Sequence, residues 1–199
     1  IIQGWGNVAA TAAYYLSQYG AKIVGIIDKN GGLLQENGFS FNKISKLLEN
    51  RTSNYLNDPE IKSYDEINNK IWSLGAEIFI PAAASRIVKN DQLENMINND
   101  LEVISAGANV PFADKEIFFG PIAKTADESI SVIPDFISNC GMARTFSYLM
   151  QKNIKMNDFA IFDAVSKTIH EALVDTYKLN KTKTNLAKTA FEIALTKLI

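Results

Sequence analysis

Short apolar runs alternate along the chain with longer stretches in which apolar residues recur every three or four positions. The short runs are typical of strands covered on both faces, and the longer stretches are typical of amphipathic helices. The expected strands are 1–3, 22–28, 76–81, 101–105 and 131–134. This alternation predicts an α/β fold that is Rossmann-like and doubly wound, with a mostly parallel sheet and helices on both faces.

Helices are expected between these strands and directly after the last of them. The expected helices are 7–19, 42–49, 64–74, 91–98 and 135–151. Gly20 is placed to end the first helix, and Asp91 is expected to cap the fourth. The Asn-rich stretch 30–57 is otherwise expected to form a loop.

From Met156 onward the pattern is purely helical. Asp158 is expected to open one helix, and 182–199 is expected to form another. The apolar residues of the second helix recur on one face; they are Ala187, Ala190, Phe191, Ala194, Leu195 and Leu198. We therefore expect a dinucleotide-binding domain over residues 1–155 and a C-terminal helical extension, residues 156–199, that packs on it.

Composition excludes several classes of partner. The 199 residues include 20 Lys and Arg and 22 Asp and Glu, so the basic excess typical of a nucleic-acid binder is lacking. No apolar run approaches the roughly 18 residues of a membrane span, so no membrane partner is expected. The single cysteine, Cys140, excludes an intrachain disulfide and suits a cytoplasmic location.

A glycine-rich turn follows the first expected strand. Residues 4–9 read Gly-Trp-Gly-Asn-Val-Ala, the pattern G-x-G-x-x-A, at the point where a helix should begin. Gly4 permits the tight turn, Gly6 lets a pyrophosphate approach the backbone, and Ala9 is small enough for close helix–strand packing. Amide groups at the helix N-terminus would then face the phosphates, so the turn predicts a dinucleotide site.

An acidic residue ends the second expected strand. Asp28 follows Gly6 by 22 residues, close to the spacing of the acid that binds the adenosine ribose. A carboxylate there favours NAD, but NADP is not excluded because the neighbouring Lys29 can pair with a 2′-phosphate. A different interpretation makes Asp28 a turn residue before Gly31 and Gly32.

Four later motifs stand where the remaining strands should end. They are Ile-Pro-Ala-Ala at 80–83, Ser-Ala-Gly-Ala-Asn-Val-Pro at 105–111, Val-Ile-Pro-Asp at 132–135 and Ser-Asn-Cys-Gly at 138–141. With the glycine turn and Asp28, this ordered set resembles the C-terminal domain of the glutamate/leucine/phenylalanine/valine dehydrogenase family, over about residues 1–151. The resemblance implies oxidative deamination of an L-amino acid to a 2-oxo acid and ammonia, with hydride transfer to NAD(P).

The resemblance also implies roles for individual residues. The pyrophosphate would be held by the glycine turn, that is by Gly4, Gly6, Asn7 and Val8. Pro81 and Ala82 would line the cofactor groove. Asn109 would lie near the nicotinamide and its ribose, and Asn139 near both the nicotinamide and the substrate.

The sequence departs from the family pattern at three positions. Ala106 stands where the family often has Glu, and Met142 stands where it often has a second glycine. Phe146 occupies a substrate-proximal position that is usually Ser in glutamate-specific members, so it suits an aliphatic or aromatic substrate better. Arg144 would still offer a carboxylate partner if it faced the cleft, and the substrate is left open.

The acid–base lysines and aspartate of this family belong to an N-terminal domain that this sequence does not contain. The chain opens inside an expected strand without an initiator Met, so we expect a truncated piece that binds cofactor and is inactive by itself. No catalytic residue and no metal ligand is assigned to it. The whole enzyme would bind its small-molecule amino-acid substrate with the missing domain and form a homo-oligomer.

Two other functions compete with the dehydrogenase. One is a non-catalytic nucleotide-sensing Rossmann module, and the other is a different Rossmann enzyme, such as a folate dehydrogenase. A sensing module has no need of Asn109 and Asn139 around a nicotinamide, and the other enzyme does not predict Gly-Ala-Asn-x-Pro followed by Pro-Asp and Asn-x-Gly. The only histidine, His170, is interpreted as a helix-surface residue, Cys140 as a small buried thiol, and Trp72 as core; Trp5 either packs beneath the cofactor or fills the core.

Overall fold

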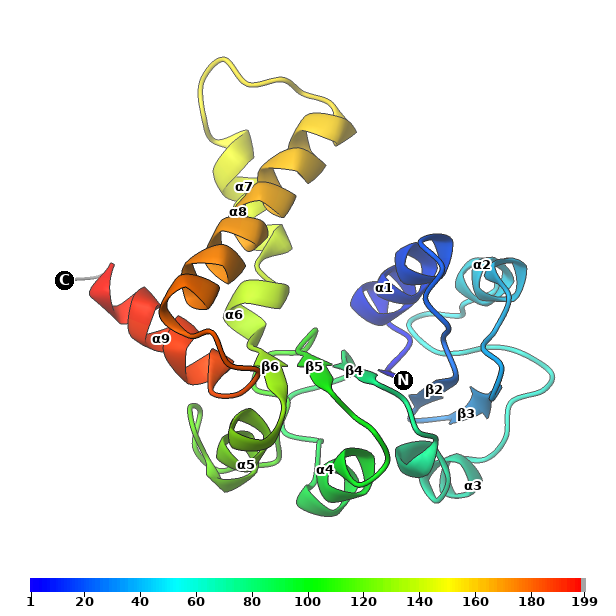
Figure 1. The fold of residues 1–199 in the computed structure, drawn as a ribbon. Helices are drawn as coiled ribbons and strands as arrows, with labels where there is room; N and C mark the ends of the chain where they lie inside the picture. Colours follow the sequence, from blue (N-terminus) through cyan, green and yellow to red (C-terminus); the bar gives the residue numbers. More distant parts are fainter. Residues whose placement is uncertain (198–199) are drawn as a thin grey trace.

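The computed structural model describes residues 1–197 and contains a six-stranded sheet in the order β3-β2-β1-β4-β5-β6 (Figure 1). The strands are β1 (Ile2–Gln3), β2 (Gly25–Asp28), β3 (Gly31–Leu34), β4 (Ile78–Pro81), β5 (Val103–Ser105) and β6 (Ser131–Ile133). Five of them run parallel, as the sequence predicts, so their carboxyl ends share one edge of the sheet.

The strand β3 is the exception and was not predicted. It pairs antiparallel with β2, from Asp28 opposite Gly31 to Gly25 opposite Leu34, so only Lys29 and Asn30 form the connecting turn. Gly31 has φ +140°, and a Cβ there would lie 2.0 Å from the Lys62 carbonyl oxygen. The two glycines that indicate a loop in the sequence are therefore the residues that let this hairpin form.

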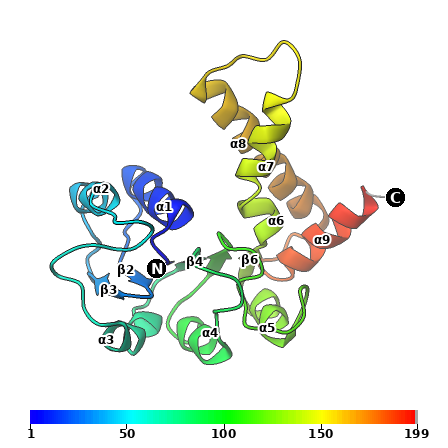
Figure 2. The ribbon, with the colours of Figure 1, turned by 180° about the vertical axis from the view of Figure 1, so that it is seen from behind.

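Helices cover both faces of the sheet, so the predicted doubly wound architecture is confirmed. Figures 1 and 2 show α1 and α2 over one face and α3, α4 and α5 over the other. The helices are α1 (Asn7–Gln18), α2 (Phe41–Glu49), α3 (Tyr64–Asn68), α4 (Asn90–Ile97), α5 (Pro121–Ser129), α6 (Asp135–Ser138), α7 (Gly141–Leu149), α8 (Asp158–Leu179) and α9 (Leu186–Thr196), with a 3₁₀ turn at Ile71–Ser73.

The helices differ from the prediction in several places. The helix α5 was not predicted, because its first turn is capped from outside by Asp114, which accepts hydrogen bonds from the amides of Ile122 and Ala123. The expected helix 135–151 is broken into α6 and α7, and 64–74 into α3 and the 3₁₀ turn. Asp91 lies inside α4, whose first turn is closed instead by the Gln92 side chain accepting from the Lys89 amide.

Two buried clusters hold the layers together, and each tryptophan belongs to one. Trp72 packs against Phe79, with ring centroids 5.7 Å apart, in the cluster that includes residues of α4. Trp5 is 1% exposed, and its indole Nε1 donates to the Leu47 carbonyl oxygen across 3.1 Å. The second cluster therefore joins α2 to the glycine turn; it includes Ile2, Ala9, Ala10, Ala13, Ile26, Ile44 and Leu47.

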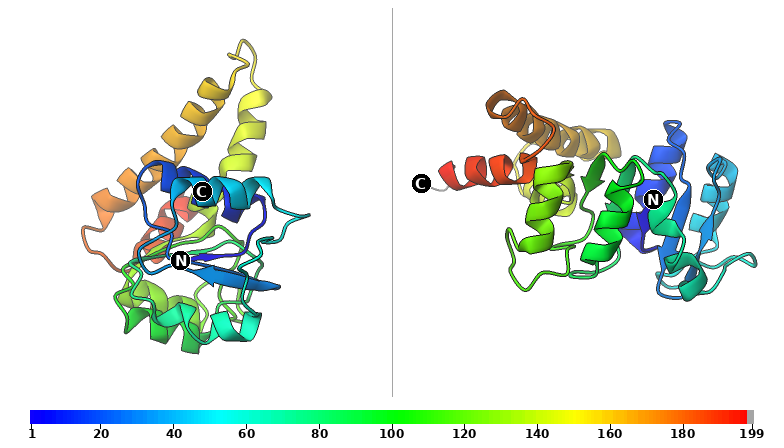
Figure 3. Two further views of the ribbon diagram at one scale, coloured as in Figure 1. Left: turned by 90° about the vertical axis from the view of Figure 1, so that its right-hand side faces the viewer. Right: turned by 60° about the horizontal axis from the view of Figure 1, so that its bottom comes forward.

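The C-terminal helices contact the end of the sheet at β6. Figure 3 shows α7 and α8 as an antiparallel pair that stands out from the sheet. The helix α9 packs against β6. Asp127 of α5 accepts hydrogen bonds from the amides of Ala187 and Lys188, and so it caps α9. Leu198, which was expected on the apolar face of this helix, lies outside the described residues. Among residues 1–197, none of the helices is long and apolar enough to cross a membrane.

Candidate cofactor-binding site

A cavity of about 750 Å³ opens at the carboxyl ends of β1, β2 and β4. Backbone hydrogen bonds join the ends of these strands. The Gly4 amide donates to the Ile27 carbonyl oxygen, and the Ala82 amide donates to the Gln3 carbonyl oxygen. Six of the predicted cofactor residues line it, namely Gly4, Gly6, Asn7, Val8, Asp28 and Ala82. The edge of a parallel sheet where strands end is where ligands bind in open α/β folds.

The two glycines of the turn serve different purposes. Gly4 has φ +100°, and a Cβ there would lie 2.7 Å from the Ala83 Cα, so the protein itself requires glycine. Gly6 has an ordinary φ of −73°, and a Cβ there would meet no described atom within 4 Å. The free space above Gly6 leaves the first turn of α1 open to a ligand, as a bound pyrophosphate requires.

Two further features of the cavity suit a polar ligand. The helix α1 begins at Asn7 without a side-chain cap among the described residues, so its first amides are available to an anion. Gln3 is 7% exposed, and its Oε1 has no hydrogen-bond partner within residues 1–197. A buried oxygen without a partner is costly, and a ligand with a donor group would relieve that cost. The residues present therefore fit a dinucleotide.

Asp28 has the position of a ribose-binding acid and also the contacts of a turn residue. It lines the cavity at the end of β2, as the ribose-binding interpretation expects. It is also only 6% exposed, and its two carboxylate oxygens accept hydrogen bonds from the amides of Asn30, at 2.7 Å, and Leu56, at 2.6 Å. Asp28 thus closes the hairpin and holds the 52–57 loop over the end of β2.

That loop brings residues to the cavity that the sequence pattern did not indicate. Asn54 and Tyr55 line it, and the Lys29 Nζ lies 4.0 Å from the centroid of the Tyr55 ring. Arg51 donates from Nη2 to the Oδ1 of Asn7 in the glycine turn, across 2.8 Å. Their positions follow from the loop's anchor on Asp28, for which the sequence gives no local signal.

Asn109 and Asn139 form a pair beside the cavity rather than lining it. Asn139 Nδ2 donates to Asn109 Oδ1 across 2.6 Å. The link to the cavity is Gly107, where a Cβ would lie 2.8 Å from the Ala82 Cβ and 3.2 Å from Val8 Cγ1. The pairing leaves Asn109 Nδ2 as a donor and Asn139 Oδ1 as an acceptor, which is the complement of a carboxamide.

The remaining predicted residues are dispersed. Pro81 ends β4, and its carbonyl oxygen accepts from the Ala108 amide. Phe146 lies on α7, is 58% exposed and does not line the cavity. Arg144 does not extend freely, because its Nε donates to Thr168 Oγ1 of α8 across 2.9 Å.

His170 lies where it was predicted, whereas Cys140 is only partly buried and not the fully buried thiol that was expected. His170 is exposed on α8. Cys140 is half-buried, and burial raises the pKa of its thiol, which makes it a weaker nucleophile at neutral pH. In residues 1–197 no cluster of His, Cys, Asp and Glu has the arrangement of a metal site.

Sequence comparison identifies relatives of this chain. The family model for Glutamate/Leucine/Phenylalanine/Valine dehydrogenase matches residues 1–199. The NADP-specific glutamate dehydrogenase of Saccharolobus shibatae is 29% identical over 182 residues, which make up 89% of this chain and 39% of that protein. NAD-specific glutamate dehydrogenase A of Halobacterium salinarum is 28% identical over 149 residues, which make up 70% of this chain and 29% of that protein. The chain thus spans less than half the length of these relatives.

Structure comparison shows the same fold. The hetero-hexameric glutamate dehydrogenase from Thermus thermophilus superposes with a TM-score of 0.70 at 18% identity, over 99% of this chain and 45% of that chain. Glutamate dehydrogenase 2 from Plasmodium falciparum gives a TM-score of 0.67 at 22% identity, over 94% of this chain and 42% of that chain. Since the family model covers the entire sequence, the chain belongs to the glutamate/leucine/phenylalanine/valine dehydrogenase family.

Proposed function

We propose that the chain is the NAD(P)-binding domain of an amino-acid dehydrogenase. The observation that carries this proposal is the cavity of about 750 Å³ whose lining joins the glycine turn, the end of β2 and the end of β4. Its open space above Gly6 and the unpartnered Gln3 oxygen both suit a bound dinucleotide. The relatives named above are NADP-specific and NAD-specific glutamate dehydrogenases, in agreement with that cofactor class.

Each part of the cofactor has a matching group in this proposal. The amides of the glycine turn and the start of α1 hold the pyrophosphate, and Asp28 lies at the adenosine ribose. Asn109 and Asn139 receive the nicotinamide carboxamide, with a donor from the first and an acceptor from the second. The bound cofactor would supply the hydride acceptor, and these residues would orient its nicotinamide ring.

The whole protein would oxidatively deaminate an L-amino acid to a 2-oxo acid and ammonia. Its acid and base are assigned to a domain outside this sequence, so the 199-residue chain binds cofactor without catalysing the reaction. We further propose a homo-oligomeric whole enzyme with a cytoplasmic location, the latter because a single cysteine suits a reducing compartment.

Calorimetric titration of the chain with NADH and NADPH tests the proposal. We expect saturable binding of at least one of them with one site per chain, and no turnover when an amino acid is added. Circular dichroism and a cooperative melt establish that the titrated chain is folded. A folded chain that bound neither nucleotide would overturn the proposal, and so would measurable deamination by the chain alone.

A further inference from the structure

A second cavity, of about 170 Å³, lies between the outer strand β6 and the helices α8 and α9, and we call it the β6 cavity. All three residues of β6 line it, followed by Pro134 and by Ile137 of α6. Within the described part of the chain it shares no lining residue with the dinucleotide cavity. It is therefore a separate place in which a ligand can bind.

The middle residue of β6 turns its backbone toward the outer side of the sheet. The Ser131 amide donates to the Glu102 carbonyl oxygen, and the Ile133 carbonyl oxygen accepts from the Ala106 amide, so Ser131 and Ile133 both face β5. Because backbone groups alternate in direction along a strand, the amide and carbonyl of Val132 point away from β5. In residues 1–197 no further strand pairs with β6 on that side.

The amide and carbonyl of Val132 have no hydrogen-bond partner in the described chain. Val132 is nevertheless only 3% exposed. Its side chain belongs to the buried cluster that contains Ala126 of α5, and α5 and α8 lie on opposite sides of the sheet (Figure 1). The backbone is thus the part of Val132 that faces the β6 cavity. A buried donor and acceptor without partners are unfavourable, so a ligand that supplies both partners is stabilised there.

Most of the remaining lining is apolar. Ile137 and Ala190 are buried in its interior, together with Leu186 at the start of α9. Leu173 and Tyr177 of α8 also line the cavity but are exposed, so they lie at its mouth. A ligand that enters past α8 can therefore bury an aliphatic body inside.

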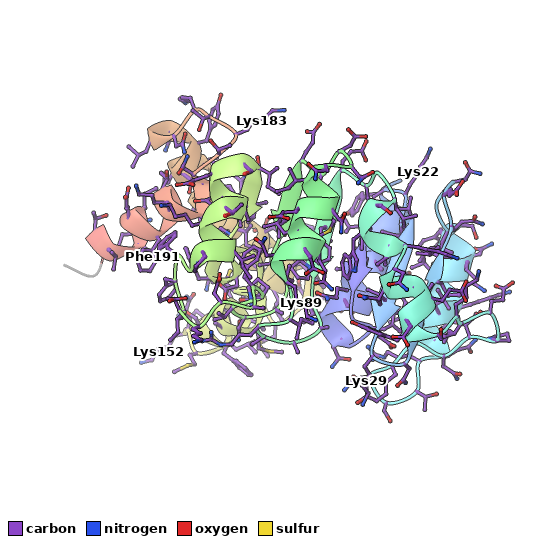
Figure 4. The ribbon with its side chains drawn as sticks, turned by 90° about the horizontal axis from the view of Figure 1, so that it is seen from below. Lys22, Lys29, Lys89, Lys152, Lys183 and Phe191 are labelled. Carbon is purple, nitrogen blue, oxygen red and sulfur yellow. The ribbon has the colours of Figure 1, made fainter. Side chains whose placement is uncertain are left out.

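The lining contains one charged residue, Lys183, and its ammonium is directed elsewhere. The Lys183 Nζ lies 3.7 Å from Glu102 Oε2, and the side chain is 85% exposed. Figure 4 shows Lys183 at the margin of the molecule. A charged ligand would have to give up its hydration without gaining an opposite charge, so the β6 cavity favours an uncharged one.

Hydrogen bonds hold the walls of the β6 cavity in place. Ser131 Oγ donates to the Lys183 carbonyl oxygen across 2.7 Å. The Asn185 amide donates to the Asp127 carbonyl oxygen, and the Ala187 amide donates to the Asp127 carboxylate. These contacts attach the turn between α8 and α9 to β6 and α5, so the two helices cannot simply collapse onto the strand.

We propose that the β6 cavity is a binding site for a small uncharged ligand that carries an amide group on an aliphatic body. The ligand N–H donates to the Val132 carbonyl oxygen, and the ligand carbonyl oxygen accepts from the Val132 amide. A residue of a neighbouring strand makes the same two bonds in a hydrogen-bonded pair. The aliphatic body packs against Leu186 and Ala190, where its removal from water is favourable. The site is independent of the proposed function, because no residue of the dinucleotide cavity takes part.

Four probes test the donor, the charge and the aliphatic body separately. 4-Methylpentanamide has all the proposed features, whereas methyl 4-methylpentanoate lacks the donor, 4-methylpentanoate is charged, and acetamide lacks the body. Titrations followed by nuclear magnetic resonance should show saturable binding of 4-methylpentanamide, at least about tenfold tighter than that of each other probe. The Val132 amide resonance should move downfield on binding, because this amide gains an acceptor.

Variants assign the binding to this cavity. Ala190→Leu fills its interior and Leu173→Trp narrows its mouth, so each should weaken binding of 4-methylpentanamide at least about tenfold. Leu173 is exposed, so its variant tests the site without changing the core. Leu179→Trp is the matched control, because Leu179 is another exposed leucine of α8 that does not line the cavity, and affinity should stay within about twofold. Thermal melts verify that each variant is folded.

Several results would overturn the site. The folded chain could fail to bind 4-methylpentanamide, or bind the ester equally well, which would show that the Val132 backbone does not receive the amide group. Equal or tighter binding of the carboxylate would show that the cavity takes an anion. Unchanged affinity in both cavity variants, or an equal loss in Leu179→Trp, would place the ligand elsewhere on the chain.

Discussion

The Asp135 carboxylate accepts a hydrogen bond from the amide of Val110 across 2.8 Å, although the two residues are 25 positions apart. Val110 has φ +46°, a left-handed conformation that is strained for a β-branched residue. The Val110 carbonyl oxygen also accepts from the Arg86 amide. Surrounding hydrogen bonds thus hold a strained residue next to Asn109, which is typical of loops that position functional groups.

We predict that Asp135→Ala loosens this loop and weakens binding at the nicotinamide end. NADH should bind about tenfold more weakly, whereas ADP-ribose, which lacks the nicotinamide, should change by less than about twofold. Competition calorimetry with the two ligands gives the ratio. Equal weakening of both would mean that Asp135 supports the whole cavity and has no particular role at Asn109.

The two glycines of the turn should respond differently to alanine. Gly4→Ala places a Cβ 2.7 Å from the Ala83 Cα at φ +100°, so we expect the free energy of unfolding to fall by about 1–3 kcal/mol. Gly6→Ala meets no described atom and should change it by less than about 0.5 kcal/mol. Its methyl group would instead fill the approach to the α1 amides, and NADH affinity should fall about tenfold. Urea unfolding and calorimetry distinguish the two; a Gly6→Ala variant with unchanged affinity would remove the pyrophosphate from this turn.

Trp5 is 1% exposed and also lines the cavity, and we expect its indole to contribute to stability more than to cofactor contact. Trp5→Phe removes the indole donor and leaves the Leu47 carbonyl oxygen without its partner, which should cost about 1–3 kcal/mol of unfolding free energy. NADH affinity should remain within about threefold of the unmodified chain. A large loss of affinity with unchanged stability would support the other interpretation, in which the ring lies beneath the cofactor.

Asp127 should make stability depend on pH. It is 3% exposed, and burial raises its pKa, although the amides of Ala187 and Lys188 oppose that rise. The folded chain then binds a proton more tightly than the unfolded chain does, so stability conferred by Asp127 declines as the pH rises from about 4 through the raised pKa. Asp127→Asn lacks this titration.

Urea unfolding of both chains from about pH 4 to about pH 8 measures the effect. The free energy of unfolding of the unmodified chain minus that of Asp127→Asn should fall with rising pH across the window and then level off. A difference that grew with pH would show that the two amide hydrogen bonds outweigh burial. Asp127→Ala, which leaves the start of α9 uncapped, should cost about 0.5–2 kcal/mol.

Sequence patterns predicted the helices and strands that are determined by residues close together in the chain. The parallel strands are apolar runs followed by motifs, and α1 begins at the glycine turn and is followed by Gly20, as expected. Elements that depend on distant partners were missed. The strand β3 is only Gly-Gly-Leu-Leu and pairs with β2 and with Lys62, and α5 relies on the Asp114 carboxylate for its first turn.

The residues of the candidate site also fall into a predictable and an unpredictable group. Residues in motifs at strand ends reach the cavity because the fold gathers those ends, and six of them line it. Asn54 and Tyr55 reach it because Asp28 binds the Leu56 amide, a contact between residues 28 positions apart. No periodicity or spacing in the sequence encodes that contact, so the residues that flank the adenosine end were not predictable.

The β2–β3 hairpin also affects whether another chain can pair with the edge of the sheet. An outer strand normally offers unpaired backbone groups that another molecule can extend into a larger sheet. Here the outer strand has four residues, and both the amide and the carbonyl of Gly32 are engaged by Lys62. Little backbone is left for edge-to-edge association, so this side of the molecule is protected against β-type aggregation by the same turn that places Lys29 at the mouth of the cavity.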